Sequence, residues 1–266
     1  MPPPRVLRAL LPSLASVLLL VGSLLSAGAK AEVPVVAAAS DLQFALAEVA
    51  ESFQAQSGES LKLVFGSSGN FYRQIIQGAP FQLYLSADER YVEELAAAGR
   101  TLDQGVLYAV GRIVLIVPRD SKLNAKAGIE GLRAALAAGQ MDKFAIANPE
   151  HAPYGQRAEE ALRHAGLWDD LQGKLVLGEN VSQAAQFALS GNAQGGIVAY
   201  SLALAPNLAK RGEFALIPQQ WHQPLRQRMV LLNNANATSQ AFYRYLQGPA
   251  ARSIMARHGF ALPEAE

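Results

Sequence analysis

The feature of this 266-residue sequence that most constrains its fold is a repeated order of segments. A short apolar run leads into a small or polar turn, and the turn leads into a stretch with helical spacing. The first copy runs from 33–38 through Ala39-Ser40 into a stripe of apolar residues at Leu42, Ala45, Leu46, Val49 and Phe53. Alternation of strands and helices predicts an α/β fold with mostly parallel sheets flanked by helices.

The same order recurs in two blocks, which predicts two lobes. Further strand-like runs lie at 61–65, 81–85, 144–147, 175–177 and 195–200. The apolar run 112–118 ends at Pro118 before a polar loop, and this change of character indicates a crossing between the lobes. A second crossing is expected within 214–226. We therefore expect a first lobe of 32–112 and 222–266, and an inserted second lobe of 113–221.

The N-terminal segment predicts export. Arg5 and Arg8 precede an uncharged stretch, 9–29, and A-x-A patterns follow it. The stretch is long enough to span a bilayer, so an uncleaved transmembrane anchor is the alternative. Pro12, the many small residues and the A-x-A patterns favour a signal peptide, 1–31, that is cleaved after Ala31. We therefore expect the protein in the periplasm.

Charge and composition exclude several classes of function. Removal of 1–31 removes three basic residues and no acidic one, so the net charge changes from +1 to −2. No Lys/Arg block remains to bind a phosphate backbone, so no nucleic-acid partner is expected. The absence of cysteine excludes disulfides, thiolate metal sites and cysteine nucleophiles. The histidines show no metal-ligand spacing and the common catalytic motifs are missing, so no direct metal ligands and no enzyme are expected.

Four turns that follow strands are candidates for a binding site. They are Ala38-Ala39-Ser40-Asp41, Gly66-Ser67-Ser68-Gly69, Pro153-Tyr154-Gly155 and Gly178-Glu179-Asn180-Val181. Ligands of open α/β sheets bind at such turns, and helix N-termini offer N–H donors to an anion without any Lys or Arg. The alternative for each serine or asparagine is an ordinary N-cap. Asp41 and Glu179 are expected to point away and to interact with the helix dipoles.

Short motifs along the chain resemble the periplasmic molybdate-binding proteins of ABC importers, from about residue 33 to 261. The motifs are Val-Ala-Ala-Ala-Ser at 36–40, Phe-Gly-Ser-Ser at 65–68, Arg-Gln-Ile at 73–75, Gly-Ala-Pro at 78–80, Ser-Ala-Asp at 86–88, Asn-Pro-Glu-His-Ala-Pro at 148–153, Gly-Ile-Val at 196–198, Phe-Tyr at 242–243 and Leu-Gln-Gly-Pro at 246–249. Their order and spacing, rather than any single motif, make the resemblance specific.

The resemblance implies a type II periplasmic binding protein fold, with a ligand cleft between two lobes that closes on molybdate or tungstate. It implies no cofactor, a monomer, and an ABC importer membrane permease as partner. Ser40 and Ser68 would bind the oxyanion from the first lobe, and Tyr154 and Val181 from the second. Asp41 is a further candidate. Tyr154 stands where some relatives have Ala, so a phenol could add a hydroxyl here.

Tyr200 is a further candidate ligand that departs from the family pattern. Some members carry a ligand-binding Tyr directly after Gly-Ile-Val, whereas Ala199 occupies that position here and Tyr200 follows it. On a strand, a shift of one residue reverses the direction of the side chain. Tyr154 is therefore the alternative source of a phenol.

Three other functions remain open at this point. The first is binding of another oxyanion, such as sulfate or thiosulfate. The second is an exported hydrolase, which is disfavoured because no Ser, His and acid stand in a recognisable nucleophile turn. The third is a sensor or adaptor domain that docks to a membrane receptor.

Overall fold

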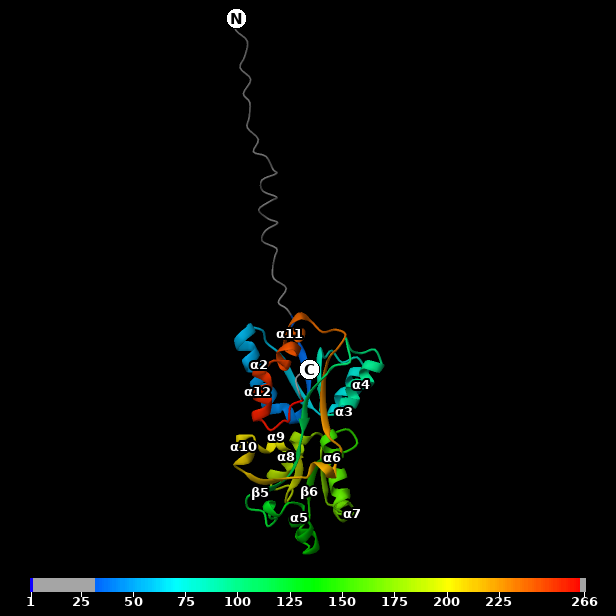
Figure 1. Ribbon diagram of the computed structural model, residues 1–266, viewed down its shortest axis with the longest axis vertical. Coiled ribbons are helices and arrows are strands. Elements are labelled where there is room, and N and C mark those ends of the chain that lie inside the picture. Colours follow the sequence, from blue (N-terminus) through cyan, green and yellow to red (C-terminus); the bar gives the residue numbers. More distant parts are fainter. Residues whose placement is uncertain (2–31, 264–266) are drawn as a thin grey trace. The chain divides into compact units, whose positions relative to one another are not determined.

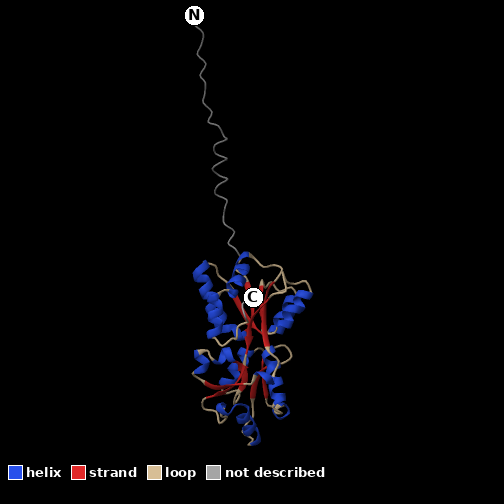
Figure 2. Ribbon diagram, in the orientation of Figure 1, coloured by secondary structure: helices blue, strands red, loops and turns tan. Residues whose placement is uncertain are grey.

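Two five-stranded sheets, each covered by helices on both faces, form the body of the protein (Figures 1 and 2). The computed structural model describes residue 1 and residues 32–263, and the predicted signal peptide and its cleavage site lie outside that range. Residues 33–266 form one unit, and both sheets belong to it. Each sheet with its helices is one lobe.

The first lobe contains strands from both ends of this unit. Its sheet has the order β2-β1-β3-β10-β4. The strands are β1 (Val35–Ala39), β2 (Lys62–Gly66), β3 (Leu83–Ser86), β4 (Val106–Gly111) and β10 (Leu225–Leu231). Alternate side chains of β1 enter different cores: Val36 and Ala38 pack under one set of helices and Ala37 under the other. Both faces of this sheet are therefore buried, as the continuous apolar run predicts.

The second lobe is built from the middle of the chain. Its sheet has the order β7-β6-β8-β5-β9. The strands are β5 (Ile113–Pro118), β6 (Phe144–Ala147), β7 (Leu175–Gly178), β8 (Gly196–Ala199) and β9 (Gly212–Leu216). Its core is continuous with Ala39, Ala87 and Leu225 of the first lobe, so apolar side chains also pack across the boundary.

Each lobe has its own set of helices, which pack against its sheet. In the first lobe they are α2 (Gln43–Ser57), α3 (Ser68–Ile76), α4 (Glu89–Ala97), α11 (Ala237–Gln247) and α12 (Pro249–Arg257), and the short turn η1 (Ser40–Leu42) precedes α2. In the second lobe they are α5 (Gly128–Ala137), α6 (Pro153–His164), α7 (Trp168–Leu171), α8 (Val181–Leu189), α9 (Tyr200–Ala203) and α10 (Pro206–Ala209), with short turns η2 (Ala125–Ala127) and η3 (Gln219–Trp221). None of the helices among the described residues combines the length and apolar character needed to cross a membrane.

The expectation of mostly parallel sheets holds for three strands of each sheet. In the first, β1 is parallel to β2 and β3, while β10 is antiparallel to β3 and β4. In the second, β6 is parallel to β7 and β8, while β5 is antiparallel to β8 and β9. The antiparallel pairs arise at the crossings. Only Arg112 separates β4 from β5, so the chain enters the second sheet directly from the first instead of through a βαβ connection.

Helix α6 lies unusually close to strand β6 because Gly155 stands at their contact. A Cβ atom built on Gly155 would lie 2.1 Å from the carbonyl oxygen of Ala147 and 2.9 Å from the nitrogen of Pro149. Both atoms belong to the backbone, which cannot yield as a flexible side chain does. Gly155 therefore fixes the position of the first turn of α6, which contains Tyr154.

We expect Gly155→Ala to destabilise the protein by about 1–3 kcal/mol, because the added methyl group forces α6 away from β6. Urea unfolding followed by circular dichroism measures this change. Gln156→Ala, at a partly exposed position of the same helix, is the matched control and should shift stability by no more than about 0.5 kcal/mol. Equal effects of the two substitutions would contradict the close approach.

Candidate functional site

The four predicted turns meet at one cavity between the lobes. Its lining residues are Ala39, Ser40, Asp41, Gly66, Ser67, Ser68, Ala87, Ala152, Pro153, Tyr154 and Val181. The structure thus brings together the predicted residues Ser40, Ser68, Tyr154 and Val181, with Asp41 beside them, and adds Ala87 from the turn after β3. In this arrangement of the lobes the cavity volume is about 10 Å³, which is about the space of one water molecule.

Two buried serine hydroxyls each accept a hydrogen bond from the main chain. The Oγ of Ser68 accepts a hydrogen bond from the N–H of Ala87 at 2.9 Å. The Oγ of Ser40 accepts one from the N–H of Ser182, in the opposite lobe, at 3.2 Å. Because a hydroxyl that accepts a bond still has its own proton to give, both groups can donate to an acceptor in the cavity. Such an acceptor would be an anion or another oxygen-rich ligand.

The capping alternative does not apply to these two serines. Helix α3 is capped by Ser67, whose Oγ accepts from the N–H of Asn70, and not by Ser68. Helix α8 is capped by Asn180, which accepts from the N–H groups of Ser182 and Gln183. Residue 39 is the N-cap of η1, where no side-chain capping bond is made, so the Ser40 hydroxyl caps nothing of its own. Neither serine therefore caps the helix that follows it: Ser40 accepts from the first turn of α8 in the opposite lobe, and Ser68 accepts from Ala87.

The main chain supplies further donors to the cavity. Ser68 and Val181 are the first residues of α3 and α8, and Tyr154 is the second residue of α6, after Pro153. The first N–H groups of a helix have no intrahelical acceptor, and they stand at the positive end of the helix dipole. Helix N-termini from both lobes therefore border the same small space, as the sequence predicted.

The prediction that Asp41 points away from the site is wrong. Asp41 is 1% exposed. Its Oδ2 accepts hydrogen bonds from the Tyr154 hydroxyl at 2.9 Å and from Nε2 of Gln227 at 2.7 Å. The Ser201 hydroxyl donates a hydrogen bond to the backbone carbonyl of Asp41 at 2.9 Å. The carboxylate is directed toward these partners rather than outward along the helix, because Tyr154 and Gln227 reach it from α6 and β10.

Burial dominates the acid strength of Asp41. It raises the pKa of the carboxyl group from 3.8 to about 6, although hydrogen bonds from Gln227, Tyr154 and the N–H groups of Asp41 and Leu42 act in the opposite direction. The other carboxylate oxygen, Oδ1, is buried and makes no hydrogen bond that meets geometric criteria with any described residue. Both side-chain donors of the carboxyl group therefore bind Oδ2, and Oδ1 has none.

The two tyrosine candidates differ in position. Tyr154 lines the cavity, but its hydroxyl donates to Asp41 and accepts from Gln227, so that proton is not available to a ligand. Burial raises the pKa of Tyr154 well above its usual value, which keeps the phenol protonated. Tyr200 is not among the lining residues: it begins α9, and its ring packs edge-on against Phe214. Because the strand ends at Ala199, the two-residue period of a strand does not extend to Tyr200.

A polar group of four residues joins the lobes beside the cavity, and we call it the interlobe latch: Ser67, Asn70, His151 and Glu179. The Ser67 hydroxyl lies 2.9 Å from Nδ1 of His151, and the N–H of Gly69 donates to the His151 carbonyl at 3.0 Å. The Asn70 amide donates to Glu179, whose other oxygen lies 3.6 Å from Nε2 of His151. Glu179 is exposed, yet it spans the two lobes rather than pointing away.

Sequence reasoning missed Gln227, Ser201 and the bonding role of His151. Each lies far along the chain from its partner, and although His151 belongs to the motif at 148–153, that motif does not show which residue it contacts. Asp88 and Arg157 form a further ion pair between the lobes at 3.5 Å. Among residues 32–263, no cluster of three or more His, Asp or Glu is arranged to hold a metal ion.

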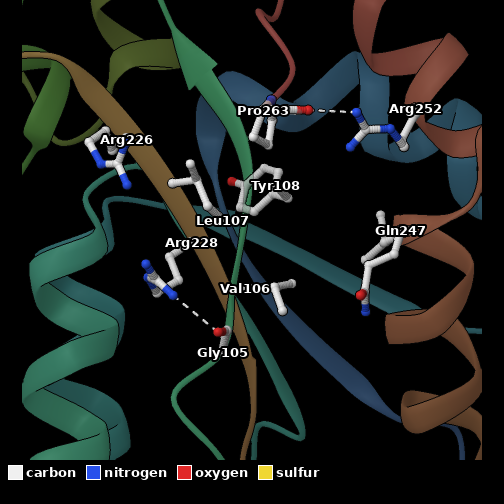
Figure 3. A pocket seen from close by; sticks show the side chains of 10 residues that line it. Gly105, Val106, Leu107, Tyr108, Arg226, Arg228, Gln247, Arg252 and Pro263 are labelled. Atoms are coloured by element: carbon white, nitrogen blue, oxygen red, sulfur yellow. Dashed lines mark hydrogen bonds between the residues drawn. The ribbon is translucent and has the colours of Figure 1, made fainter. Parts of the chain in front are cut away.

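A wider cavity of about 270 Å³ lies along strand β4, and it contains three arginines (Figure 3). Arg226 and Arg228 pair with Glu89, and Arg228 also donates to the carbonyl of Gly105. Arg252 donates to the carbonyl of Pro263. Since each guanidinium already has an oxygen partner from the protein, these cations serve the fold. The cavity between the lobes is the better candidate for binding.

Two α/β lobes that enclose a cavity lined by donors define a solute-binding protein. The chain belongs to the family of bacterial extracellular solute-binding proteins, which matches residues 34–261.

Among its relatives is the molybdate-binding protein ModA of Azotobacter vinelandii, 34% identical over 243 residues that cover 90% of this chain and 94% of the relative. ModA of Rhodobacter capsulatus is 34% identical over 216 residues, 80% of this chain and 82% of its own. The solved structure of the Azotobacter vinelandii periplasmic molybdate-binding protein superposes with a TM-score of 0.79 at 30% identity, covering 87% of this chain and 100% of that chain.

The raised pKa of Asp41 predicts that the free energy of unfolding decreases as the pH rises through the range in which this carboxyl group ionises. The unfolded carboxyl ionises around 3.8 and the folded one around 6, so this group stabilises the fold less as the pH rises between these values, by up to roughly 3 kcal/mol. Asp41→Asn cannot ionise. We therefore expect its stability relative to the wild type to increase over this window, as measured by urea unfolding at both ends. Glu130→Gln, at an exposed ion pair of α5, should show no such trend, and a flat difference for Asp41→Asn would contradict the burial argument.

Proposed function

We propose that this protein captures molybdate or tungstate between its two lobes in the periplasm and delivers the oxyanion to an ABC importer membrane permease. The observation that carries the proposal is the cavity in which the hydroxyls of Ser40 and Ser68 and the N-termini of three helices converge. The ModA relatives support the choice of ligand, since each is named for molybdate binding.

Neutral donors are sufficient for a dianion when it is enclosed. No Lys or Arg is among the lining residues. Helix N-termini bind anions through oriented N–H groups, and hydrogen bonds to a charged acceptor are about twice as strong as neutral ones. All the donors would bind oxygens of the anion, so no side chain would coordinate the metal atom. We propose that binding is the whole function, without a cofactor and without chemical change of the ligand.

We propose that uptake requires the lobes, 32–112 with 222–266 and 113–221, to move apart. The cavity has room for about one water molecule in the present arrangement. The chain crosses between the lobes at Arg112 and between β9 and β10, and few residues would have to change their backbone angles for a hinge motion. All lining residues come from one chain, so a monomer would suffice.

If residues 1–31 are a signal peptide, the exported protein should begin at Glu32. Expression of the full chain in a Gram-negative bacterium, followed by osmotic release of the periplasm and N-terminal sequencing, measures this. A protein that stays with the membrane fraction and retains its N-terminus would favour the transmembrane anchor.

Ser40→Ala and Ser68→Ala should each raise the Kd for molybdate about 10- to 100-fold, because each removes a donor to a charged oxygen worth about 1.5–3 kcal/mol. Isothermal titration calorimetry with molybdate and tungstate measures the change. Ser60→Ala, at an exposed position, is the control and should bind like the wild type. Unchanged affinity in both cavity variants would mean that these hydroxyls do not contact the ligand.

Another oxyanion, such as sulfate or thiosulfate, is the second candidate, because neutral donors recognise a charge and an oxygen arrangement that these anions share. The sulfate-binding protein SubI of Mycobacterium tuberculosis H37Rv has the same fold, with a TM-score of 0.69 at 16% identity. Competition titration separates the candidates. Tight sulfate binding without any heat from molybdate or tungstate would replace the first proposal by the second.

One group of residues in the structure bears on the hydrolase alternative. Ser67, His151 and Glu179 do form a chain of Ser, His and acid. However, Ser67 Oγ also accepts the capping bond of α3, and Glu179 contacts His151 only at 3.6 Å from an exposed position. We propose that the three residues fasten the lobes. Hydrolysis of a nitrophenyl ester panel by the wild type that disappears in Ser67→Ala would restore the hydrolase.

A further inference from the structure

Asp41 is the one acidic residue in the lining of a cavity that otherwise combines neutral polar residues with small apolar ones. It lines the same space as Ser40 and Ser68, and its side chain is buried. Oδ2 is occupied by Tyr154 and Gln227, both of which act as donors to it. Oδ1 is buried with no hydrogen bond of good geometry from any described residue. An ionised carboxylate at this position would repel the oxyanion, and the low polarity of the cavity would strengthen the repulsion.

We propose that Asp41 accompanies the oxyanion as a neutral carboxylic acid, donating a proton from Oδ1 to an oxygen of the ligand, so that the protein takes up one proton for each oxyanion it captures. The inference rests on the proposed function. The proton comes from solvent, stays on the pair formed by Asp41 and the oxyanion, and returns to solvent when the ligand leaves. No bond of the oxyanion is broken.

The arrangement around Asp41 favours this protonation. Burial already raises its pKa to about 6 in the unliganded cavity, and a neighbouring dianion would raise it further. Oδ1 is the oxygen that can carry the proton, because both side-chain hydrogen bonds of the carboxyl group go to Oδ2. A protonated carboxyl is both donor and acceptor, so it can keep its bonds to Tyr154 and Gln227 and donate to the ligand at the same time.

The other groups around Asp41 do not offer a competing charge. The phenols of Tyr154 and Tyr108 stay protonated, since burial raises the pKa of each well above its usual value. Helix α8 contains no ionisable side chain, and α9 contains only Tyr200. Charged residues on the remaining elements form ion pairs with one another: Glu48 of α2 with Arg257 and His258, Glu89 of α4 with Arg226 and Arg228 of β10, and Arg157 of α6 with Asp88 and Glu160. Lys62 of β2 is exposed.

The consequence is an affinity that falls with rising pH. Above the pKa of the free carboxyl group, each further pH unit should raise the Kd about tenfold, because the proton must then be taken from increasingly dilute solution. Below that pKa the affinity should level off. A cavity that contained only hydroxyl and N–H donors would show neither trend.

Isothermal titration calorimetry of the mature protein with micromolar molybdate, between about pH 6 and 9 and in two buffers of different ionisation heat, counts the protons directly. We expect close to one proton taken up per ligand at about pH 8, and a Kd that rises about tenfold per unit. Asp41→Asn should take up none and bind with an affinity independent of pH. Glu130→Gln, whose carboxylate pairs with Arg133 on α5, should behave like the wild type.

Two results would overturn the inference while leaving the proposed function intact: oxyanion binding by the wild type without proton uptake, or unchanged uptake in Asp41→Asn. If His151→Gln lost the proton uptake and Asp41→Asn kept it, the proton would be assigned to the interlobe latch instead of Asp41. If Asp41→Asn fails to fold, the proton count of the wild type still decides. Absence of binding to molybdate, tungstate and sulfate at every pH would instead refute the proposed function, and the inference with it.

Discussion

Enclosure of an anion without cations requires that donors reach it from several directions, and this requirement organises the whole molecule. Two sheets that each end in polar turns supply the donors, and the two crossings of the chain keep those turns opposed. The close contact of α6 with β6 at Gly155 has the same purpose, because it sets the depth at which the first turn of α6 meets the cavity. The packing inside each lobe therefore also sets the positions of the residues that line the cavity.

The sequence was informative wherever function follows from local order. Periodicity and turn composition predicted the strands, the helices and the four turns, because each depends on residues a few positions apart. Within each lobe the turns lie together because parallel strands direct their carboxyl ends to one edge, and the two pairs of turns meet because the lobes face each other. Ser40 and Ser68 could therefore be placed at one site before any coordinates were known.

Long-range contacts were not predictable in the same way. Asp41 is 186 residues from Gln227 and 113 from Tyr154, and no pattern in the sequence connects them. The direction of its side chain depends on which partners arrive from α6 and β10. Similarly, the sequence could not assign capping among adjacent residues: Ser67, rather than Ser68, caps α3. Tyr200 does not line the cavity, and because β8 ends one residue before it, the alternation of strand side chains could not predict its direction.

The bond from the N–H of Ser182 to the Ser40 hydroxyl joins residues of opposite lobes. A hydroxyl that lines the cavity is therefore restrained by a hydrogen bond from the lobe across from it. In the lobe opening that we propose, that N–H would be withdrawn and the hydroxyl would turn freely in water. Affinity is thus a property of the closed shape rather than of a fixed set of side chains. A membrane partner that pulls the lobes apart would empty the cavity by mechanical means alone, without competing for the cargo.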